Sequence, residues 1–395
     1  MPGPFSSTPS PYTLHNQVRL IRGGKDYFSA LLELIASAKE VIHFQTYIFS
    51  LDATGERVTR ALENAADRGV VVYLMADGYA SQSLSGVFEE RMRKAGIRFR
   101  LFEPILKSSN FYFGRRLHQK VVVADASVAL VAGVNISDRY NDLPGQPAWL
   151  DWAIGVEGEA AGQLHQICAE LWVRHAFRKK RMLEWAGEPK FDAHRHCRVR
   201  VRRNDWVQMY NEVSRSYLSM LNSAKTSVVI MSSYFLPGRA IRNSMARAVR
   251  RGVVVELILA GKSDVAVAKQ AERYFYRWLL RHGIRIHEYP GNVLHGKLAT
   301  SDGHFVTGGS YNVNKLSAYA SIELNLDVDD RFFASEVGLA LERIRDEECV
   351  RVTEDGYRTK YGWWSRLVQQ GSYEVVNLLF YIFTFYFRQQ RHVAP

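Results

Sequence analysis

The sequence predicts an α/β fold made of two repeats, each with a mixed or parallel sheet flanked by helices, packed with pseudo-twofold symmetry around one active site. Three observations predict it. A strand–helix–strand–helix order occurs twice along the chain. One set of His, Lys, Asp and Asn residues closes each repeat at matching spacings. The composition, with 47% hydrophobic and 23% charged residues among 395, indicates a folded chain with a sizeable core.

Each repeat opens with a strand after a Ser-Ala-Lys step. Residues 41–49 follow the first such step, at 37–39, and residues 228–236 follow the second, at 223–225. Both runs are rich in β-branched and aromatic residues and are therefore expected to be strands.

A helix follows each of these strands. Apolar residues recur at helical spacing, at Val58, Leu62 and Ala65 in the first repeat and at Ile241, Met245 and Val249 in the second. Each helix is expected to end at an Arg-Gly step, because Gly69 and Gly252 suit a C-cap. A Val-Val-Val strand comes next, and a second helix is predicted at 85–95 and at 266–282.

The chemistry-bearing motif lies late in each repeat. In both copies Lys follows His by two residues, Asp by seven and Asn by seventeen. The two sets are His118, Lys120, Asp125 and Asn135, and His295, Lys297, Asp302 and Asn312. A single His-x-Lys is a weak signal, but two complete copies at matching places in a repeat predict a functional site.

These residue types suit the transfer of a phosphodiester. Alternate residues of a strand share a face, so His and Lys are expected to point into one space. Imidazole can attack phosphorus and hold the phosphoryl group covalently, while ammonium and amide groups bind its oxygens. The second His can protonate the departing oxygen, a role that one His could not readily combine with attack.

The paired motifs resemble those of the phospholipase D superfamily, over roughly residues 18 to 335. Within it the chain is most similar to bacterial cardiolipin synthases, particularly the B type. The stretches that carry this likeness are 294–302, the Gly-Gly-Ser-Tyr-Asn block ending at Asn312, 316–317 with 322–325, 77–79 and 234–238.

The resemblance implies a phosphatidyl-histidine intermediate, formed without metal or other cofactor. His118 is expected to be the nucleophile and His295 the acid and base, although the near-symmetry of the motifs leaves the reverse assignment open. Asp151 and Glu323 occupy the place of the carboxylates that orient the histidines in the family.

Two further expectations concern the same motifs. Asp125 and Asp302 are expected to fix the motif strands by salt bridges. The hydroxyl of Ser310 has no counterpart in the first repeat, which has Gly133 there, so phosphate binding is expected to be asymmetric.

The repeats and their flanks predict five regions. They are a loose Pro- and Ser-rich tail (1–17), a first phospholipase D-like domain (18–177), a basic linker (178–203), a second such domain (204–350) and a C-terminal membrane-associating segment (351–395). The linker is interpreted as either solvated or phosphate-facing.

The C-terminal segment predicts contact with a membrane. Trp363 and Trp364 precede an apolar run over 375–387 that is flanked by arginine and is too short to span a bilayer as a helix. A buried core element is the alternative. The formal net charge of +12 favours polyanionic partners in general, including an anionic membrane surface.

Composition gives weaker guidance on the cell compartment. Three widely spaced cysteines, Cys168, Cys197 and Cys349, form no disulfide or zinc pattern, and the N-terminus lacks a signal-peptide pattern. With the resemblance, this predicts a peripheral protein on the cytoplasmic face of a bacterial membrane. His194, His196 and Cys197 lack further ligands at a suitable spacing, so no metal site is expected.

The leading hypothesis is cardiolipin synthesis: transfer of a phosphatidyl group between phospholipids, with phosphatidylglycerol as donor or acceptor and phosphatidylethanolamine as a further candidate substrate. A hydrolytic phospholipase D is the alternative. A nuclease of the same superfamily fits the charge but not the aromatic tail, so nucleic acid is not the expected partner. A non-catalytic membrane scaffold is disfavoured because both motifs keep every reactive group.

Overall fold

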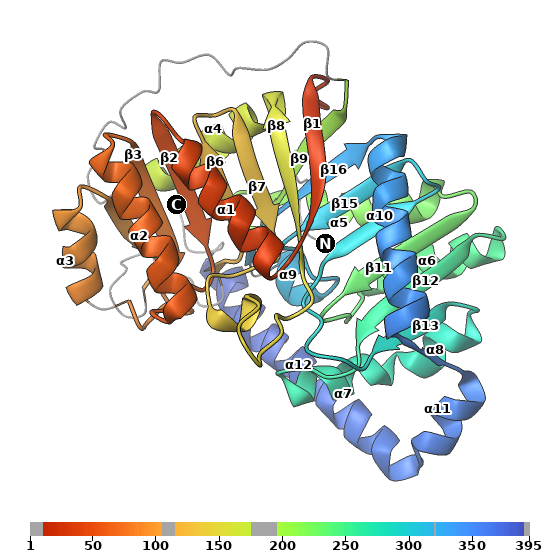
Figure 1. Ribbon diagram of the computed structural model, residues 1–395. Helices are drawn as coiled ribbons and strands as arrows, with labels where there is room; N and C mark the ends of the chain where they lie inside the picture. The colour runs from red at the N-terminus through yellow and green to blue at the C-terminus, as the bar shows by residue number, and fades with distance from the viewer. Residues whose placement is uncertain (1–10, 85, 105–114, 175–195, 320, 391–395) are drawn as a thin grey trace.

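The computed structural model describes residues 11–84, 86–104, 115–174, 196–319 and 321–390. Two sheets, one from each half of the chain, stand side by side with helices on their outer faces (Figure 1). The predicted two-repeat α/β architecture is therefore confirmed.

The first sheet has the strand order β1-β8-β7-β6-β2-β3-β4. Its strands are β1 (Asn16–Arg22), β2 (Val41–Thr46), β3 (Val71–Asp77), β4 (Arg98–Phe102), β6 (Lys120–Ala124), β7 (Val128–Ala132) and β8 (Trp152–Gly158). The helices of this half are α1 (Lys25–Ser37), α2 (Ala53–Asp67), α3 (Gly86–Lys94), the 3₁₀ turn η1 (Asp138–Tyr140) and α4 (Glu159–Arg174).

The second sheet has the order β10-β9-β16-β15-β14-β11-β12-β13-β17. Its strands are β9 (Arg198–Asp205), β10 (Tyr210–Asn211), β11 (Ser227–Ser232), β12 (Val254–Ala260), β13 (Arg285–Tyr289), β14 (Leu298–Ser301), β15 (Phe305–Gly309), β16 (Ser321–Asp329) and β17 (Val350–Val352). The helices of this half are α5 (Glu212–Ser223), α6 (Arg239–Arg250), α7 (Ala266–Tyr274), α8 (Tyr276–Arg281), α9 (Lys315–Tyr319), α10 (Arg331–Arg343), the π turn η2 (Ile344–Glu348), α11 (Glu354–Lys360) and α12 (Trp363–Gln390).

The two sheets repeat one connectivity. The parallel run β2-β3-β4 corresponds to β11-β12-β13, and the antiparallel run β6-β7-β8-β1 corresponds to β14-β15-β16-β9. The glycines predicted as C-caps occupy equivalent places, with Gly69 at φ 90° and Gly252 at φ 89°, in the left-handed region that glycine favours. One predicted helix differs: residues 266–282 form α7 and α8, which meet at Phe275.

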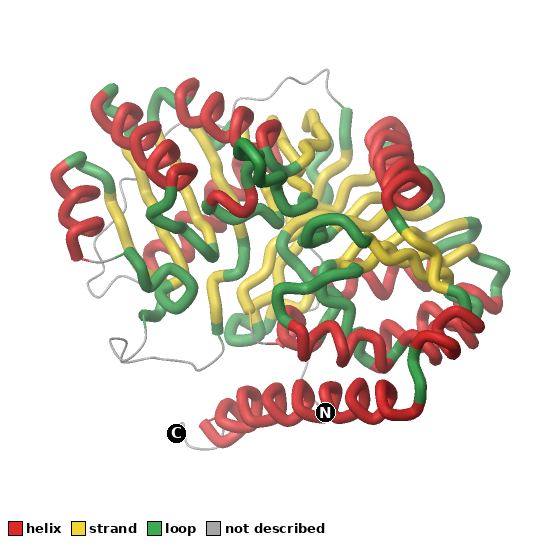
Figure 2. The backbone as a smooth tube through the Cα atoms, turned by 60° about the horizontal axis from the view of Figure 1, so that its bottom comes forward, coloured by secondary structure: helices red, strands yellow, loops and turns green. Residues whose placement is uncertain are grey.

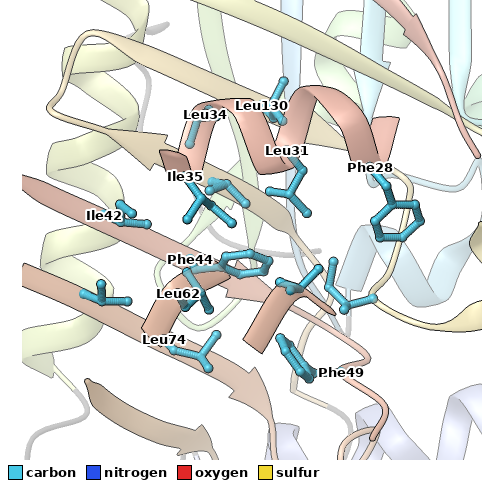
Figure 3. Packing of buried hydrophobic residues seen from close by; sticks show 14 of the residues in the cluster. Phe28, Leu31, Leu34, Ile35, Ile42, Phe44, Phe49, Leu62, Leu74 and Leu130 are labelled. Atoms are coloured by element: carbon cyan, nitrogen blue, oxygen red, sulfur yellow. The ribbon is translucent and has the colours of Figure 1, made fainter. Parts of the chain in front are cut away.

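Apolar layers hold the sheets and helices together. In the first half, α1 and α2 cover one face of the sheet, where Phe28, Leu31 and Leu62 meet Phe44 and neighbouring strand residues (Figure 3). An equivalent layer lies under α5 and α6 in the second half. Between the two, the inner faces of both sheets pack on each other, so the halves share one central core. That shared core fixes how the two motifs face each other.

Two ends of the predicted regions differ from the structure. Residues 198–203, expected in the linker, belong to β9, where Val199 and Val201 enter the central core and Arg200 lies 3.0 Å from the buried Asp327 carboxylate. The alternation of Val and Arg was therefore a strand signal. In the expected tail, Thr13 exchanges backbone hydrogen bonds with Val199, and β1 begins at Asn16. Residues 178–195 of the expected linker lie outside the described residues.

Helix α12 closes the underside of the molecule. It runs beside α7 (Figure 2), and Tyr373 stacks on Tyr274 at a ring distance of 4.7 Å. Its other side leaves large apolar residues exposed to solvent; they are Trp363, Trp364, Leu367, Val368, Val375, Leu378, Leu379 and Tyr381. Among the described residues, no helix combines the length and apolar character needed to cross a membrane.

Candidate active site

Both histidines of the paired motifs line one pocket. Its volume is about 840 Å³, and its walls come from both halves of the chain and from α12. Asn135 and Asn312 line the same pocket, while Lys120 and Lys297 are buried directly behind the histidines. The fold thus brings the two predicted motifs into one site.

A short parallel pairing between the halves positions His118. Strand β5 (Arg116–Leu117) pairs with the start of β16, so that Leu117 lies opposite Ile322. The next residue on each strand is His118 and Glu323. His118 N donates to Ile322 O at 3.0 Å, and the ring Nδ1 lies 2.9 Å from Glu323 Oε2.

The equivalent pairing from the other half positions His295. Leu150 bridges Leu294 in parallel, and the next residue on each side is Asp151 and His295. His295 N donates to Leu150 O at 2.7 Å, and its Nδ1 lies 2.6 Å from Asp151 Oδ2. Each imidazole is therefore held by a carboxylate from the other half at Nδ1, and Lys297 Nζ lies 3.3 Å from Nε2 of His295.

The contact between His and Lys has a different origin from the predicted one. His118 lies between β5 and β6, and His295 precedes β14, so neither histidine shares a strand with its lysine. Instead, each lysine side chain turns back: Lys120 Nζ donates to His118 O at 2.6 Å, and Lys297 Nζ donates to His295 O. The period-two argument was wrong although its result, His beside Lys, is observed.

Burial and like charge disfavour protons throughout the site. Desolvation, with lesser contributions from nearby lysines, lowers the pKa of His118 below its usual value and that of His295 to about 4. Desolvation and then Lys297 lower the pKa of Lys120 to about 7, and desolvation also lowers the pKa of Lys297. These low pKa values follow from burying four basic groups close together, and an anion placed among them would raise all four.

The two asparagines are placed symmetrically beside the histidines. Asn135 Oδ1 accepts from Ile48 N at 3.1 Å, and Asn312 Oδ1 accepts from Ser233 Oγ at 3.0 Å. With its oxygen occupied, each amide offers its NH₂ group as the remaining donor. Two amides and two ammonium groups then surround the space between the imidazoles.

Asp125 and Asp302 do not make the predicted salt bridges. Within the described parts of the chain, neither carboxylate has a lysine or arginine at ion-pair distance. Asp125 accepts from three successive backbone amides, at 39–41, at 2.8–2.9 Å. Asp302 accepts from the equivalent amides, at 225–227, at 2.8–3.0 Å. Both lie at the far end of the motif strands, where the tight entry to β2 and β11 exposes those amides, and neither lines the pocket.

Ser310 serves the orienting carboxylate. Its Oγ donates to Glu323 Oε2 at 2.5 Å, the same oxygen that contacts His118. At the equivalent place Gly133 lies against Asp151: a Cβ there would come within 2.3 Å of Asp151 Oδ1. The predicted asymmetry exists, but in the structure it lies in how the carboxylates are held.

Sequence reasoning missed an aromatic lining around the histidines. The Tyr47 ring lies 4.8 Å from the His118 ring, and the rings of Tyr140 and Trp149 lie 5.2 and 6.0 Å from that of His295. Asp77, quoted above only for its likeness to the family, is fully buried and accepts from Leu117 N at 2.8 Å. Tyr47 directly follows a buried strand, a position at which a site residue is common.

Some predicted features cannot be placed. His194 lies outside the described residues. His196 lies against His15 at a ring distance of 5.5 Å and does not line the pocket, and Cys197 is buried.

Comparison with known proteins follows the same two halves. A family model described as "Cardiolipin synthase, PLD-like domain" matches residues 31–152 and 217–345. The chain is 33% identical to cardiolipin synthase B of Salmonella typhi and 31% identical to that of Escherichia coli K12, over 89% of this chain and 85% of each relative.

Solved structures share the fold. The crystal structure of phosphatidylserine synthase from Haemophilus influenzae matches with a TM-score of 0.71 at 15% identity, over 93% of this chain and 96% of that one. Polyphosphate kinase from Porphyromonas gingivalis matches with a TM-score of 0.57 at 18% identity, over 91% of this chain and 53% of that one. Both likenesses concern the arrangement of the two facing sheets.

Proposed function

This chain belongs to the family of cardiolipin synthases with PLD-like domains, and from that premise we propose that it transfers a phosphatidyl group from one phospholipid to another, with phosphatidylglycerol as donor, acceptor or both. One observation carries the proposal: two imidazoles, each with a carboxylate at Nδ1, and two amides line one pocket, with two buried lysines directly behind the imidazoles. That set suits two-step exchange at phosphorus.

In the first step His118 acts as nucleophile. Its Nε2 lone pair attacks the donor phosphorus, the bond from phosphorus to the leaving oxygen breaks, and His295 Nε2–H gives its proton to that oxygen. The products are a phosphatidyl-histidine and a free alcohol. His118 is assigned to attack because its side chain is 17% exposed, against 7% for His295.

The second step reverses the first with a new alcohol. The acceptor hydroxyl gives its proton to His295 Nε2, its oxygen attacks phosphorus, and the P–N bond to His118 breaks. Glu323 and Asp151 hold each ring by Nδ1, so Nε2 faces the reaction in both steps. The site returns to its starting protonation, so one active site completes the exchange.

The site's charge prepares it for an anionic substrate. Burial lowers the pKa values of both histidines and so favours their neutral forms. A phosphodiester between the lysines favours protonation of the acid histidine, which then becomes a proton donor only when substrate is present. This coupling limits protonation of the acid histidine when no substrate is bound.

Transfer rather than hydrolysis is proposed because aromatic and aliphatic side chains form much of the pocket wall. Tyr47, Tyr79, Tyr140 and Tyr234 line it together with side chains from α12. Such walls restrict water and hold an acceptor in place, and well-oriented reactants reach effective molarities of about 10⁵ M or more. A held lipid hydroxyl then outcompetes bulk water.

The test is to incubate the purified protein with vesicles of labelled phosphatidylglycerol and to identify every lipid product, with and without phosphatidylethanolamine. We expect mainly cardiolipin and little phosphatidic acid, and unchanged rates in EDTA. Phosphatidic acid as the dominant product across these mixtures would replace the synthase by a hydrolase.

We also propose that α12 rests on an anionic membrane surface, on the cytoplasmic face of a bacterial cell membrane. Its exposed side carries Trp363, Trp364 and Leu367, and its other side lines the pocket through Tyr373 and Asn377. An apolar helix face with a tryptophan pair suits the interface between lipid headgroups and acyl chains. The pocket wall and the membrane contact would then be two sides of one helix.

Vesicle binding tests this placement. A variant with Trp363→Ser, Trp364→Ser and Leu367→Ser should co-sediment with phosphatidylglycerol vesicles much less than the parent protein, because these side chains are exposed and their loss leaves the fold intact. Gln370→Ser, an exposed polar position on the same helix, is the matched control. Equal binding by the triple variant would refute the docking face.

A further inference from the structure

The pocket extends beyond the groups that hold one phosphate. Besides the histidines and asparagines, its lining includes three cationic side chains: Arg116, Arg139 and Lys315. Joining two phospholipids brings two phosphodiester anions into one site, the one under attack and the one inside the acceptor. The acceptor's phosphate therefore needs a binding group of its own, apart from the catalytic set.

Two of the three cations already have other contacts. Arg116 lies 4.0 Å from the buried Asp77 carboxylate. Lys315 Nζ donates to Asn377 Oδ1 of α12 at 3.1 Å and lies over the Phe380 ring at 5.7 Å. Both interactions fasten parts of the pocket wall.

Arg139 is different. Across the described ranges of the chain, no carboxylate lies within ion-pair distance of its guanidinium, although the group is half-buried. It lies over two rings instead, 5.2 Å from the centre of Trp149 and 5.9 Å from that of Tyr140. A guanidinium supported on aromatic faces keeps its N–H edge available, and that edge matches two phosphate oxygens at once.

The support of Arg139 is rigid. Trp149 N donates to Arg139 O at 3.0 Å, which closes the loop that carries both residues. The preceding Asp138 accepts from Thr54 N at 2.8 Å, at the start of α2, and its own N–H donates to Asp52 at 2.8 Å. A phosphate bound here would meet a preformed site at a low entropic cost.

The same two rings lead to the acid and base. Tyr140 and Trp149 each contact both Arg139 and His295. Arg139 and His295 are therefore linked through the same pair of rings. In phosphatidylglycerol the glycerol headgroup separates the reactive hydroxyl from the phosphate, so one acceptor molecule presents a phosphate and a hydroxyl to two neighbouring groups.

We propose that Arg139 binds the phosphate of the acceptor lipid and so presents that lipid's glycerol hydroxyl to His295. This inference rests on the transfer function proposed above and assigns the acceptor side of the pocket to the first half. Lys315, which follows Asn312 by three residues as Arg139 follows Asn135 by four, is the nearest counterpart in the second half and is bound to α12 instead.

Soluble acceptors give the sharpest test. Labelled glycerol and labelled glycerophosphoglycerol, the deacylated headgroup of phosphatidylglycerol, are each offered with phosphatidylglycerol vesicles as donor. In the Arg139→Gln variant we expect the KM for glycerophosphoglycerol to rise roughly tenfold or more, since charge-assisted hydrogen bonds are lost. The KM for glycerol, which has no phosphate, should stay within about twofold, and Arg139→Lys should recover part of the difference.

Two controls separate the possible failures. Arg250→Gln removes an exposed arginine of α6 and should change neither constant. Cleavage of bis(p-nitrophenyl) phosphate, which needs only the catalytic phosphate site, should be unchanged in Arg139→Gln.

Three results would overturn the inference. Equal losses with glycerol and glycerophosphoglycerol, or a loss of diester cleavage, would assign Arg139 to the catalytic phosphate or to the fold. If the parent protein makes cardiolipin and Arg139→Gln leaves the KM of both acceptors unchanged, the acceptor site at Arg139 is refuted and the transfer function stands. If the unmodified protein produces only phosphatidic acid, the transfer function fails and the acceptor site fails with it.

Discussion

The two halves reach the same contact with different side chains. In one, the longer Glu323 approaches His118 and a serine hydroxyl, Ser310, supports it from behind. In the other, the shorter Asp151 approaches His295, accepts a hydrogen bond from the next backbone amide, and requires glycine at position 133. A longer acid leaves room for a hydroxyl behind it, and a shorter acid draws the neighbouring backbone close. The repeat therefore keeps the position of the carboxylate and not the residues that hold it.

The largest expected effect is the loss of activity when either histidine is removed, which should be the same for both halves. His118→Ala and His295→Ala should each nearly abolish cardiolipin formation, because nucleophile and acid act as a unit. The double variant should be no worse than either single one. Radiolabelled product analysis measures this, and more than about a tenth of the parent rate in either single variant would exceed what loss of such a group permits.

Removing the charge of the orienting acids should come next. Glu323→Gln and Asp151→Asn keep the shapes but favour the wrong tautomer of the ring, which in a comparable triad costs about 10⁴-fold in kcat. We expect losses of roughly 10² to 10⁴-fold in both, with thermal stability measured in parallel. Loss in only one variant would show that the two halves are not equivalent in chemistry.

Gly133→Ser places in the first half the residue that the second half has at the equivalent position, Ser310. The added Cβ would meet Asp151, so the carboxylate must move away from His295. We expect a loss of the same kind as in Asp151→Asn, at least tenfold, since a misplaced orienting group acts like a missing one. Circular dichroism checks folding, and full activity in a folded variant would show that Asp151 tolerates displacement.

Ser310→Ala is the converse change and should be milder. It removes one hydrogen bond to a charged acceptor, which is typically worth about 1.5–3 kcal/mol, so kcat should fall by roughly tenfold or more while Glu323 stays in place. A Ser310→Thr variant, which keeps the hydroxyl, serves as the comparison. Activity in Ser310→Ala equal to the parent's would assign the serine to packing alone.

The smallest expected effect is a shift in pH dependence. The pKa of Lys120 is lowered to about 7 by burial and then by Lys297, so its charge is lost as the pH rises through neutrality and kcat/KM should decline above about pH 7. The acid limb should lie below pH 6.5, because burial lowers the pKa of His118 and keeps the nucleophile neutral to lower pH. Lys120→Arg should move the alkaline limb upward, and an unmoved limb would assign it to another group.

The fold and the pairing of the motifs could be predicted from the sequence because both depend on local patterns that occur twice. The spacings from His118 to Asn135 and from His295 to Asn312 are equal, and the strands and helices that carry them follow ordinary periodicities. Asp151 and Glu323 were placed by likeness to a family, and the structure brings each to an imidazole.

What could not be predicted depends on contacts across the interface. The role proposed for Arg139 depends on Trp149, which contacts both Arg139 and His295 of the other half. No spacing in the sequence relates Arg139 to His295. The valine and arginine alternation at 198–202 was interpreted as linker because its partner, β16, lies far along the chain. Asp125 was expected to bind a cation, yet a turn's free amides were the nearer donors.

The exchange of carboxylates between the halves also has a consequence for the chain as it is being made. Glu323 follows His118 by 205 residues, so a ribosome releases the nucleophile long before the group that orients it. A first half that folds early holds Asp151 without His295, and His118 without Glu323. The ring of His118 therefore gains its carboxylate only when β16 is synthesised and docks, after both residues of the His295 and Asp151 pair have been made.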